Sequence, residues 1–177
     1  MTLNDITAAA LTELGRGHDA RSVDTYRRKF MHYANDALCD LAACFSLVRT
    51  EKHRVQGSTV DLMSLARPCM KVLSVTQDGF PMRFEYLAAS NFICIRGMGN
   101  VDISYRYVPK RLALPSDVPE IPEHLHGLIV MYVVGRERMS GDASSQHGAD
   151  AYLGLYETEK QRIRSCMYPA DEIENKW

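Results

Sequence analysis

Prolines concentrate in one short segment of this chain of 177 residues. Four of its seven prolines fall within fourteen residues, at Pro109, Pro115, Pro119 and Pro122. Proline lacks a backbone N–H for a sheet ladder and restricts the residue before it, so neither a strand nor a helix can run through this segment. The most apolar run of the sequence, LIVMYVV at 128–134, follows soon after. We therefore expect a stiff crossing that leads into a buried helix.

Two helices are predicted at the start of the chain. Apolar residues recur at helical spacing over residues 3–15, and Gly15 and Gly17 end that pattern. A longer pattern runs from about residue 22 to 46, with Ser22 as the expected N-cap. Its apolar positions form a stripe on one side of the helix: Tyr26, Phe30, Tyr33, Ala34, Ala37, Leu38, Leu41 and Phe45.

From residue 47 the period changes to two, which is typical of half-buried strands. The segments are LVRTEKHRV, TVDLM, MKVLSVT, MRFEYL, FICIR and VDISYRYV. Asp78-Gly79 predicts a hairpin turn between two of them, and Arg96–Asn100 predicts another. We expect an antiparallel sheet of four to six strands inserted between helical parts.

Two further helices are predicted after the crossing. The first has Pro122 in its first turn and apolar residues around much of its circumference, Met139 included, so it should be buried on more than one face. The last covers about 150–167. Its expected apolar side is Tyr152, Leu155, Tyr156, Ile163 and Met167, and its expected polar side is Glu157, Lys160, Gln161 and Arg164.

The predicted fold class is therefore α+β. It is a helical bundle of two N-terminal and two C-terminal helices with an inserted antiparallel β-sheet. The expected parts are the N-terminal helices at 1–46, the β region at 47–108, the crossing and C-terminal helices at 109–168, and an extended tail at 169–177.

Charge is balanced over the whole chain but not along it. The formal net charge of −1 gives no whole-molecule reason to expect nucleic-acid or membrane binding. Residues 47–112 carry ten lysines and arginines against five acids, and residues 113–177 carry six against eleven. These opposite charges could attract each other between neighbouring subunits, or they could form a gradient on a monomer.

Cysteine usage and the first residues bear on the compartment. The five cysteines form no CxxC pair and sit among apolar neighbours, as small buried hydrophobic residues do. This pattern favours a reducing compartment. MTLNDITAAALTELG does not resemble a signal peptide, and 128–134 is too short to span a bilayer. We expect synthesis in the cytoplasm.

No catalytic residue, metal ligand or cofactor-binding residue is predicted. Glu123, His124 and His126 resemble a partial metal site, but i and i+2 side chains on a helix do not share a face, so solvent-facing or first-turn histidines are expected. No local signature frames a cysteine nucleophile. Gly97-Met98-Gly99 is too short for a dinucleotide-binding loop and is expected to be a turn.

Two candidate binding segments remain. Arg27, Arg28 and Lys29 could face DNA phosphates, or could be a solvated helix face. The tail holds the only tryptophan, Trp177, and could dock on a partner, fold back on its own subunit or be an unordered terminus. The candidate partner-binding residues there are Tyr168, Ile173 and Trp177.

The order of these elements resembles the head–tail connector proteins of tailed bacteriophages, also called adaptor or head-completion proteins. The most similar stretches are VDISYRYVPKRLAL, LPSDVPEIPEHLHGLIVMYVVGRERMSGD and AYLGLYETEKQRIR. Positions that match the family pattern are Pro109, Leu114, Pro115, Pro122, Leu125, Tyr132, Arg136, Asp142 and Tyr152. TLNDITAAALTELG and the run containing Tyr33, Asn35, Ala37 and Leu38 are also similar. The likeness is to versions with a β insertion.

The resemblance implies a structural virion protein rather than an enzyme. It implies a ring, usually of twelve copies, that docks under the portal protein after DNA packaging and offers a platform for a tail or stopper protein. Packaged DNA would pass through the lumen and be touched only at its phosphates. The expected location is the head–tail junction of the virion, with no cofactor.

Two alternatives stay open at this point. One is a small cytosolic thiol or metal hydrolase, which would need a reactive cysteine or a bound metal. The other is a nucleic-acid-binding module that uses the basic segment 47–112.

Overall fold

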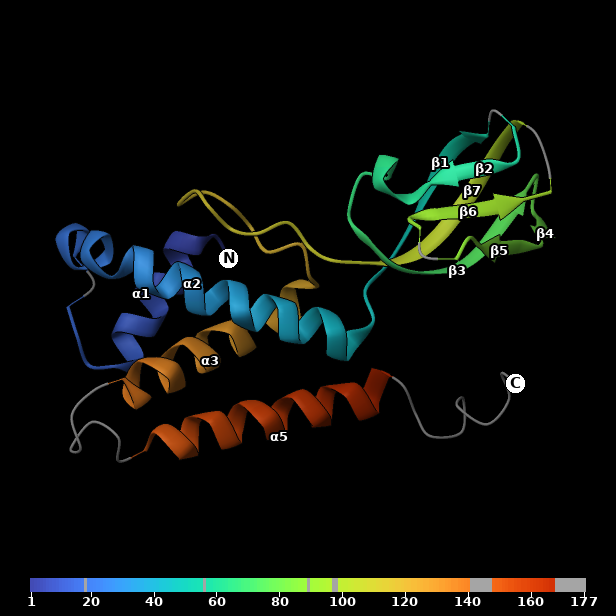
Figure 1. Cartoon of the computed structure of the whole chain (residues 1–177). Coiled ribbons are helices and arrows are strands. Elements are labelled where there is room, and N and C mark those ends of the chain that lie inside the picture. The colour runs from blue at the N-terminus through green and yellow to red at the C-terminus, as the bar shows by residue number, and fades with distance from the viewer. Residues whose placement is uncertain (18, 56, 89, 97–98, 141–147, 168–177) are drawn as a thin grey trace. The chain divides into compact units, whose positions relative to one another are not determined.

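The structure, a computed structural model, describes residues 1–17, 19–55, 57–88, 90–96, 99–140 and 148–167. The chain divides into two compact units (Figure 1). A helical unit is formed by Met1–Phe45 together with the chain from Lys110 onward, and a sheet unit is formed by Ser46–Pro109. The fold is α+β, with two N-terminal and two C-terminal helices and an antiparallel β insertion, as predicted.

The helices of the helical unit follow the predicted positions closely. They are α1 (Leu3–Glu13), α2 (Ala20–Phe45), the 3₁₀ helix η2 (Glu123–Leu125), α3 (His126–Met139) and α5 (Ala149–Met167). Helix α1 begins with a capping box, in which Thr2 and Asp5 each accept a hydrogen bond from the other's backbone N–H.

The predicted start of α2 was wrong by two residues. Asp19 precedes the helix, and its carboxylate accepts hydrogen bonds from the backbone N–H groups of Arg21 and Ser22. The Ser22 hydroxyl donates to the same carboxylate at 2.8 Å. Asp19 therefore satisfies the helix end in place of Ser22, because a carboxylate accepts several N–H groups at once.

Helix α3 occupies the centre of the helical unit and contacts α1, α2 and α5 (Figure 1). This arrangement confirms the prediction that it is buried on more than one face. A Cβ at Gly135 would lie 2.8 Å from the Leu153 side chain, so the absence of a side chain permits the close approach of α3 and α5. Met139 is 47% exposed, however, and was wrongly assigned to the buried side.

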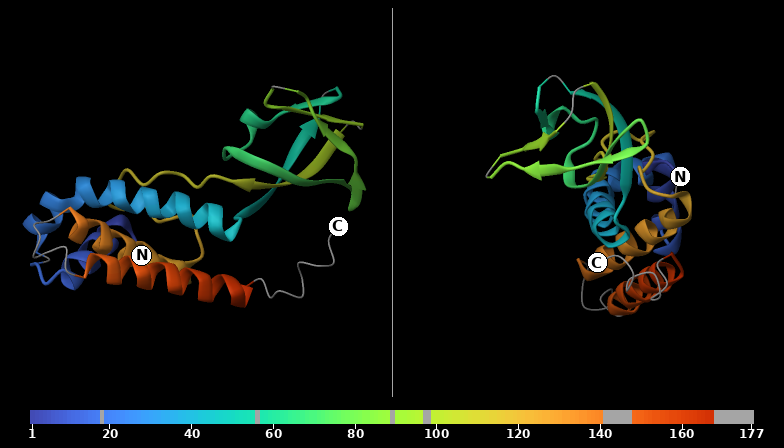
Figure 2. Two further views of the ribbon diagram at one scale, coloured as in Figure 1. Left: turned by 60° about the horizontal axis from the view of Figure 1, so that its bottom comes forward. Right: turned by 90° about the vertical axis from the view of Figure 1, so that its right-hand side faces the viewer.

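The backbone of the proline-rich crossing is hydrogen-bonded to α2 and to the start of α1. The Asn35 side chain of α2 donates to the Leu112 carbonyl at 2.9 Å and accepts from the Leu112 N–H at 2.8 Å. The N–H groups of Leu3 and Asn4 donate to carbonyls of Asp117 and Pro115. The crossing runs beside α2 in Figures 1 and 2. Its prolines remove N–H groups, and these contacts satisfy backbone groups of both segments.

The sheet unit contains seven strands among its described residues, more than the four to six predicted. They are β1 (Val48–Val55), β2 (Thr59–Asp61), β3 (Cys69–Gln77), β4 (Phe80–Met82), β5 (Phe84–Tyr86), β6 (Phe92–Ile95) and β7 (Gly99–Tyr107). They form two antiparallel sheets, with strand orders β1-β7-β3-β4 and β2-β6-β5. MRFEYL was expected to be one strand, but it divides between β4 and β5 and so passes from one sheet to the other.

One predicted hairpin is confirmed and the other is wrong. Asp78 and Gly79 have φ values of 51° and 83° and join β3 to β4 as a two-residue turn. By contrast, β6 and β7 belong to different sheets, so Arg96–Asn100 does not close a hairpin. Residues 97–98 of that segment lie outside the described residues.

The two sheets share one apolar core. Val55 of β1, two valines of β3 and alternate residues of β7 belong to it from the larger sheet, and β2 and β6 contribute from the smaller one. Its members include Val55, Val60, Val72, Val75, Ile93, Ile95, Val101, Ile103 and Tyr105. The opposite face of the larger sheet is therefore left to polar side chains.

Candidate functional site

The basic run of α2 is largely engaged within the helical unit. Arg27 forms an ion pair with Asp24 one turn earlier. Lys29 Nζ lies 2.7 Å from Glu137 Oε2 and 2.9 Å from the Ser140 hydroxyl. Arg28 is exposed. The three side chains therefore do not form a joint basic surface, although each was a candidate for facing DNA.

Glu137 is the centre of an ion cluster that joins three parts of the helical unit. It lies on α3 and is 5% exposed. Arg16, which follows α1, places Nη1 2.7 Å from Oε1, and Lys29 of α2 approaches Oε2. Burial alone would lower the pKa of Lys29, but the hydrogen bond to Glu137 and its charge outweigh burial and raise it. The buried carboxylate is thus neutralised by two cations.

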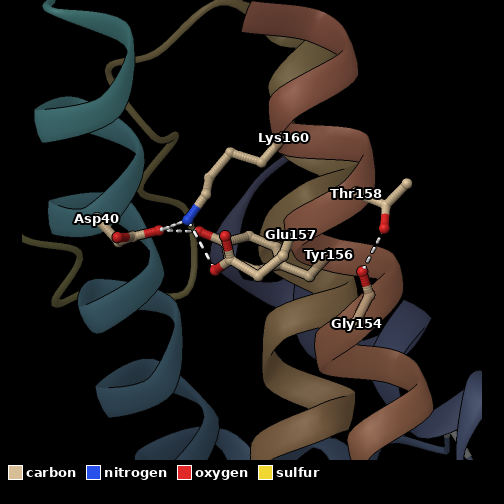
Figure 3. A network of polar contacts seen from close by, with 6 residues as sticks. All are labelled: Asp40, Gly154, Tyr156, Glu157, Thr158 and Lys160. Atoms are coloured by element: carbon tan, nitrogen blue, oxygen red, sulfur yellow. Dashed lines mark hydrogen bonds and ion pairs between the residues drawn. The ribbon is translucent and has the colours of Figure 1, made fainter.

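A second cluster has the opposite polarity and joins α5 to α2 (Figure 3). Lys160 of α5 is 6% exposed, although its charge had placed it on the predicted solvent side. Its Nζ lies 2.8 Å from Asp40 Oδ2 of α2 and 2.8 Å from Glu157 Oε1. The Tyr156 hydroxyl donates a short hydrogen bond to the same Asp40 oxygen. Here a buried cation meets two carboxylates.

The protonation states of this second cluster favour a structural role, the attachment of α5 to α2, over a catalytic one. Burial, followed by the hydrogen bond to Asp40 and its charge, raises the pKa of Tyr156 far above its usual value. Burial alone would lower the pKa of Lys160, but its hydrogen bonds to Asp40 and Glu157 raise it. At neutral pH the phenol keeps its proton and the amine stays charged. Neither group is poised as a nucleophile or a general base.

The two histidines of the partial metal motif, His124 and His126, differ in their burial. His124 is exposed, whereas His126 is 3% exposed and begins α3, so it is a first-turn histidine, one of the two expected placements, and does not face solvent. Its Nε2 lies 3.2 Å from the Ile121 carbonyl and its Nδ1 lies 3.1 Å from the Met1 amino group. Burial, and then the nearby amino group, lower the pKa of His126. Within the described ranges, no three His, Cys, Asp or Glu side chains come together to hold a metal ion.

The cysteines differ from the buried hydrophobic residues that the sequence suggested. Cys39 and Cys166 are exposed, and Cys44, Cys69 and Cys94 are half-buried. Burial raises the pKa of the Cys69 thiol, against a smaller opposite effect of the Lys71 backbone N–H. A raised pKa lowers the thiolate fraction, so Cys69 is a poor candidate for a nucleophile.

An apolar groove opens on the helical unit between α1, α3 and α5. Its volume is about 440 Å³. Leu155 of α5 lies on its rim and is 54% exposed, although it was predicted to be on the buried side of its helix. The lining residues are Met1, Glu13, Gly127, Val130, Met131, Val134, Tyr152 and Leu155.

The outer face of the larger sheet carries a set of cations that the sequence had not grouped. This outer face is the side of β1, β7 and β3 that points away from the apolar core. Its exposed basic residues are Lys52, Arg54, Lys71 and Arg106. Asp102 is its acid, and Thr50, Ser74 and Ser104 lie between the basic ends. The alternation of polar and apolar residues within each strand indicates which side chains face away from the core. Only the pairing register shows that the cations of the three strands lie on one surface.

The candidate partner-binding residues Tyr168, Ile173 and Trp177, and the whole tail 169–177, lie outside the described residues. So does Asp142, one of the positions of the family resemblance. No helix in the described part of the chain is long and apolar enough to cross a membrane.

No protein-family model matches the sequence, and no curated protein matches it either. The function must therefore be argued from the two units themselves.

Proposed function

We propose that the chain is a structural protein of a tailed-phage virion, a head–tail connector. Its copies form a ring under the portal, close the packaged head and present a platform to a tail or stopper protein. The ring is expected to hold twelve copies, as the resemblance to connectors implies. DNA passes through its lumen.

The observation that carries the proposal is the arrangement of the four helices. Three of them, α1, α2 and α5, contact α3, and the series is interrupted once, between Phe45 and Lys110, by the sheet unit. This is the element order of connectors with a β insertion. In both ion clusters the buried charge finds its partners within the helical unit, which suits a stiff building block better than a reaction site.

The apolar groove supplies a surface for a neighbouring copy. In a ring, each subunit presents two different faces, and the rotation between copies closes the assembly. An apolar groove with the half-exposed Leu155 on its rim has the composition expected at the centre of such a contact. We expect a neighbouring copy to cover Leu155 in the ring.

Light scattering over a concentration series, with negative-stain images of the same samples, tests the proposal. Closed rings of the protein alone, or rings that appear after addition of a portal protein, are expected. A chain that stays monomeric and also fails to join a portal in a pull-down would overturn the proposal.

A matched pair of variants tests the groove within this scheme. Leu155→Asp should abolish ring formation because it places a charge in an apolar contact. Leu114→Asp is the control, since Leu114 is 60% exposed in the crossing and does not line the groove. Equal ring formation by both variants would exclude the groove as the contact.

Removal of residues 169–177 tests the tail. We expect weaker portal association with the fold intact, because the tail carries Ile173 and Trp177 as candidate anchors. Circular dichroism checks the fold and a portal pull-down checks the association. Unchanged association would remove these residues from the docking surface.

The hydrolase alternative has its own test. It requires a cysteine with unusual thiol reactivity at neutral pH, or a metal bound in stoichiometric amount. Thiol labelling and elemental analysis of the purified protein address both. A stoichiometric metal, or one cysteine labelled far faster than the others, would favour it over the connector.

A further inference from the structure

The outer face of the sheet unit is a largely polar surface on which cations gather, with the exposed Val48 as an apolar member. Its three strands place Val48, Arg106 and Lys71 in one row across the sheet. Six residues along β7, at the other basic end of the face, Asn100 is paired with Arg54. A strand rises about 3.3 Å per residue, so the basic ends are about 20 Å apart. The hydroxyl groups of Thr50 and Ser104 lie between them, 2.7 Å from each other.

The positive charges of this face outnumber its acids by four to one. Lys71 and Arg106 are directly opposed across the β3–β7 ladder, where like charges destabilise a sheet. Neither they nor Lys52 and Arg54 form an ion pair with another described residue. Lys52 is paired in register with Asp102, the single acid of the face. An arrangement that costs stability in the isolated unit is explained if an anionic partner covers it.

The chemistry of the partner is inferred from the side chains that the outer face carries and from those that it lacks. The acids that hold Lys160 are already neutralised within the helical unit, and Glu159 pairs with Arg162. No aromatic side chain lies on the outer face to stack on an unpaired base, as single-strand binding requires. Lysines, arginines and hydroxyl groups are the side chains that contact the phosphates of a duplex.

We propose that the outer face of the β1-β7-β3 sheet binds the phosphate backbone of double-stranded DNA without reading its sequence. Lys52, Arg54, Lys71 and Arg106 supply the charge, and the Ser74 hydroxyl and one hydroxyl of the hydrogen-bonded pair Thr50–Ser104 donate hydrogen bonds to phosphate oxygens. The choice of DNA rests on the proposed connector function, whereas the surface is argued from the sheet itself. The face replaces Arg27, Arg28 and Lys29 as the DNA-facing surface.

Fluorescence anisotropy with a labelled blunt duplex, measured with the full chain over a range of salt concentrations, tests this inference. Four phosphate contacts predict a slope of about −3.6 in a plot of log affinity against log salt, because each contact contributes about −0.9. The double variant Lys71→Gln/Arg106→Gln should reduce the slope to about −1.8 and weaken binding at low salt. Binding of duplexes of different sequence should be equal.

Arg83→Gln/Arg96→Gln is the matched control. Both arginines are exposed on the sheet unit and lie together at a small cavity beside Cys94, away from the outer face. The control removes the same net charge, so the slope should stay at about −3.6 if the outer face is the site. Thermal unfolding of both variants checks that the sheet unit remains folded.

Four results would overturn the inference. The wild-type chain could fail to bind duplex DNA at low salt, both double variants could lose affinity equally, or the face variant could bind as the wild type does. Binding of poly-glutamate in place of DNA would also overturn it, and would identify an acidic protein as the partner.

Ring formation separates this inference from the proposed function. We expect Lys71→Gln/Arg106→Gln to form rings as the wild type does. If the protein forms rings but the double variant binds DNA as tightly as the wild type, the outer face is not the DNA-binding surface, and the connector function still stands. The chain could instead bind DNA through the outer face in a salt-dependent way but neither form rings nor join a portal. That result would support the DNA-binding face and reject the connector function.

Discussion

The helical unit and the sheet unit treat their charges in opposite ways. In the helical unit, buried Glu137 meets two cations and buried Lys160 meets two carboxylates. On the outer face of the sheet unit, by contrast, Lys71 and Arg106 are opposed in register and exposed. Charges of the first kind hold helices together, because each one is desolvated and needs its partner. Charges of the second kind reduce the stability of the sheet unit and are available to a ligand.

The largest effect is expected from Glu137→Gln. The change leaves Arg16 and Lys29 without their carboxylate, so the free energy of unfolding should fall by about 2 kcal/mol. Urea unfolding followed by circular dichroism measures this change. Glu159→Gln, which breaks a surface pair with Arg162, should cost less than about 0.5 kcal/mol. Equal losses would show that burial does not distinguish the two pairs.

A pH effect of intermediate size is expected from Tyr105 in the sheet unit. Burial, and then its hydrogen bond to Glu51, raise the pKa of Tyr105 from 10.0 to about 12. Because the folded state holds this proton more tightly, its stabilising effect is complete below pH 10 and is lost between pH 10 and 12. At pH 11 the loss should be about 1.4 kcal/mol.

Tyr105→Phe isolates that contribution. Urea unfolding at pH 8 and pH 11 should show a smaller decline for the variant than for the wild type. Identical declines in the two proteins would mean that Tyr105 does not titrate as its burial indicates.

A loss of about 1 kcal/mol is expected from Tyr156→Phe, which removes the hydrogen bond to Asp40. Thermal unfolding measures the loss. Tyr152→Phe is the control, since the Tyr152 hydroxyl reaches Glu13 at 3.4 Å in an exposed contact. If both variants were equally stable, the Lys160 cluster would hold α5 to α2 without the phenol.

The smallest effect has the opposite sign. Lys71→Glu places an acid opposite Arg106 and should stabilise the protein by about 0.5 kcal/mol, because opposite charges across a ladder attract. Arg83→Glu changes the net charge equally but creates no such pair, so it should not stabilise. A destabilising Lys71→Glu, measured by thermal unfolding, would show that Lys71 supports the fold after all.

The sequence was most informative where one element specifies itself. Helical spacing located α1, α2, α3 and α5, and the prolines marked the crossing, because these patterns depend on local geometry. Pairing of strands is not local. Alternation predicts which residues of β6 and β7 face inward, but not that the two strands belong to different sheets.

The candidate site was less predictable for the same reason. Lys160 was expected in solvent because a lone lysine is rarely buried, and its partner Asp40 is 120 residues away. Arg27, Arg28 and Lys29 attracted attention because they are adjacent in sequence. The cations of the outer face come from three strands, and only the register of β1, β7 and β3 assembles them.

The Asn35 clamp on Leu112 has a mechanical consequence. The sheet unit joins the helical unit through Phe45 and Lys110, so tension on its second connection reaches the crossing two residues before Leu112. At Leu112 the force acts on two hydrogen bonds to the Asn35 side chain of α2. Further along the chain, the carbonyls of Pro115 and Asp117 are hydrogen-bonded to the start of α1. Force on the sheet unit is thus absorbed by α2 and α1 before it can unwind the first turn of α3.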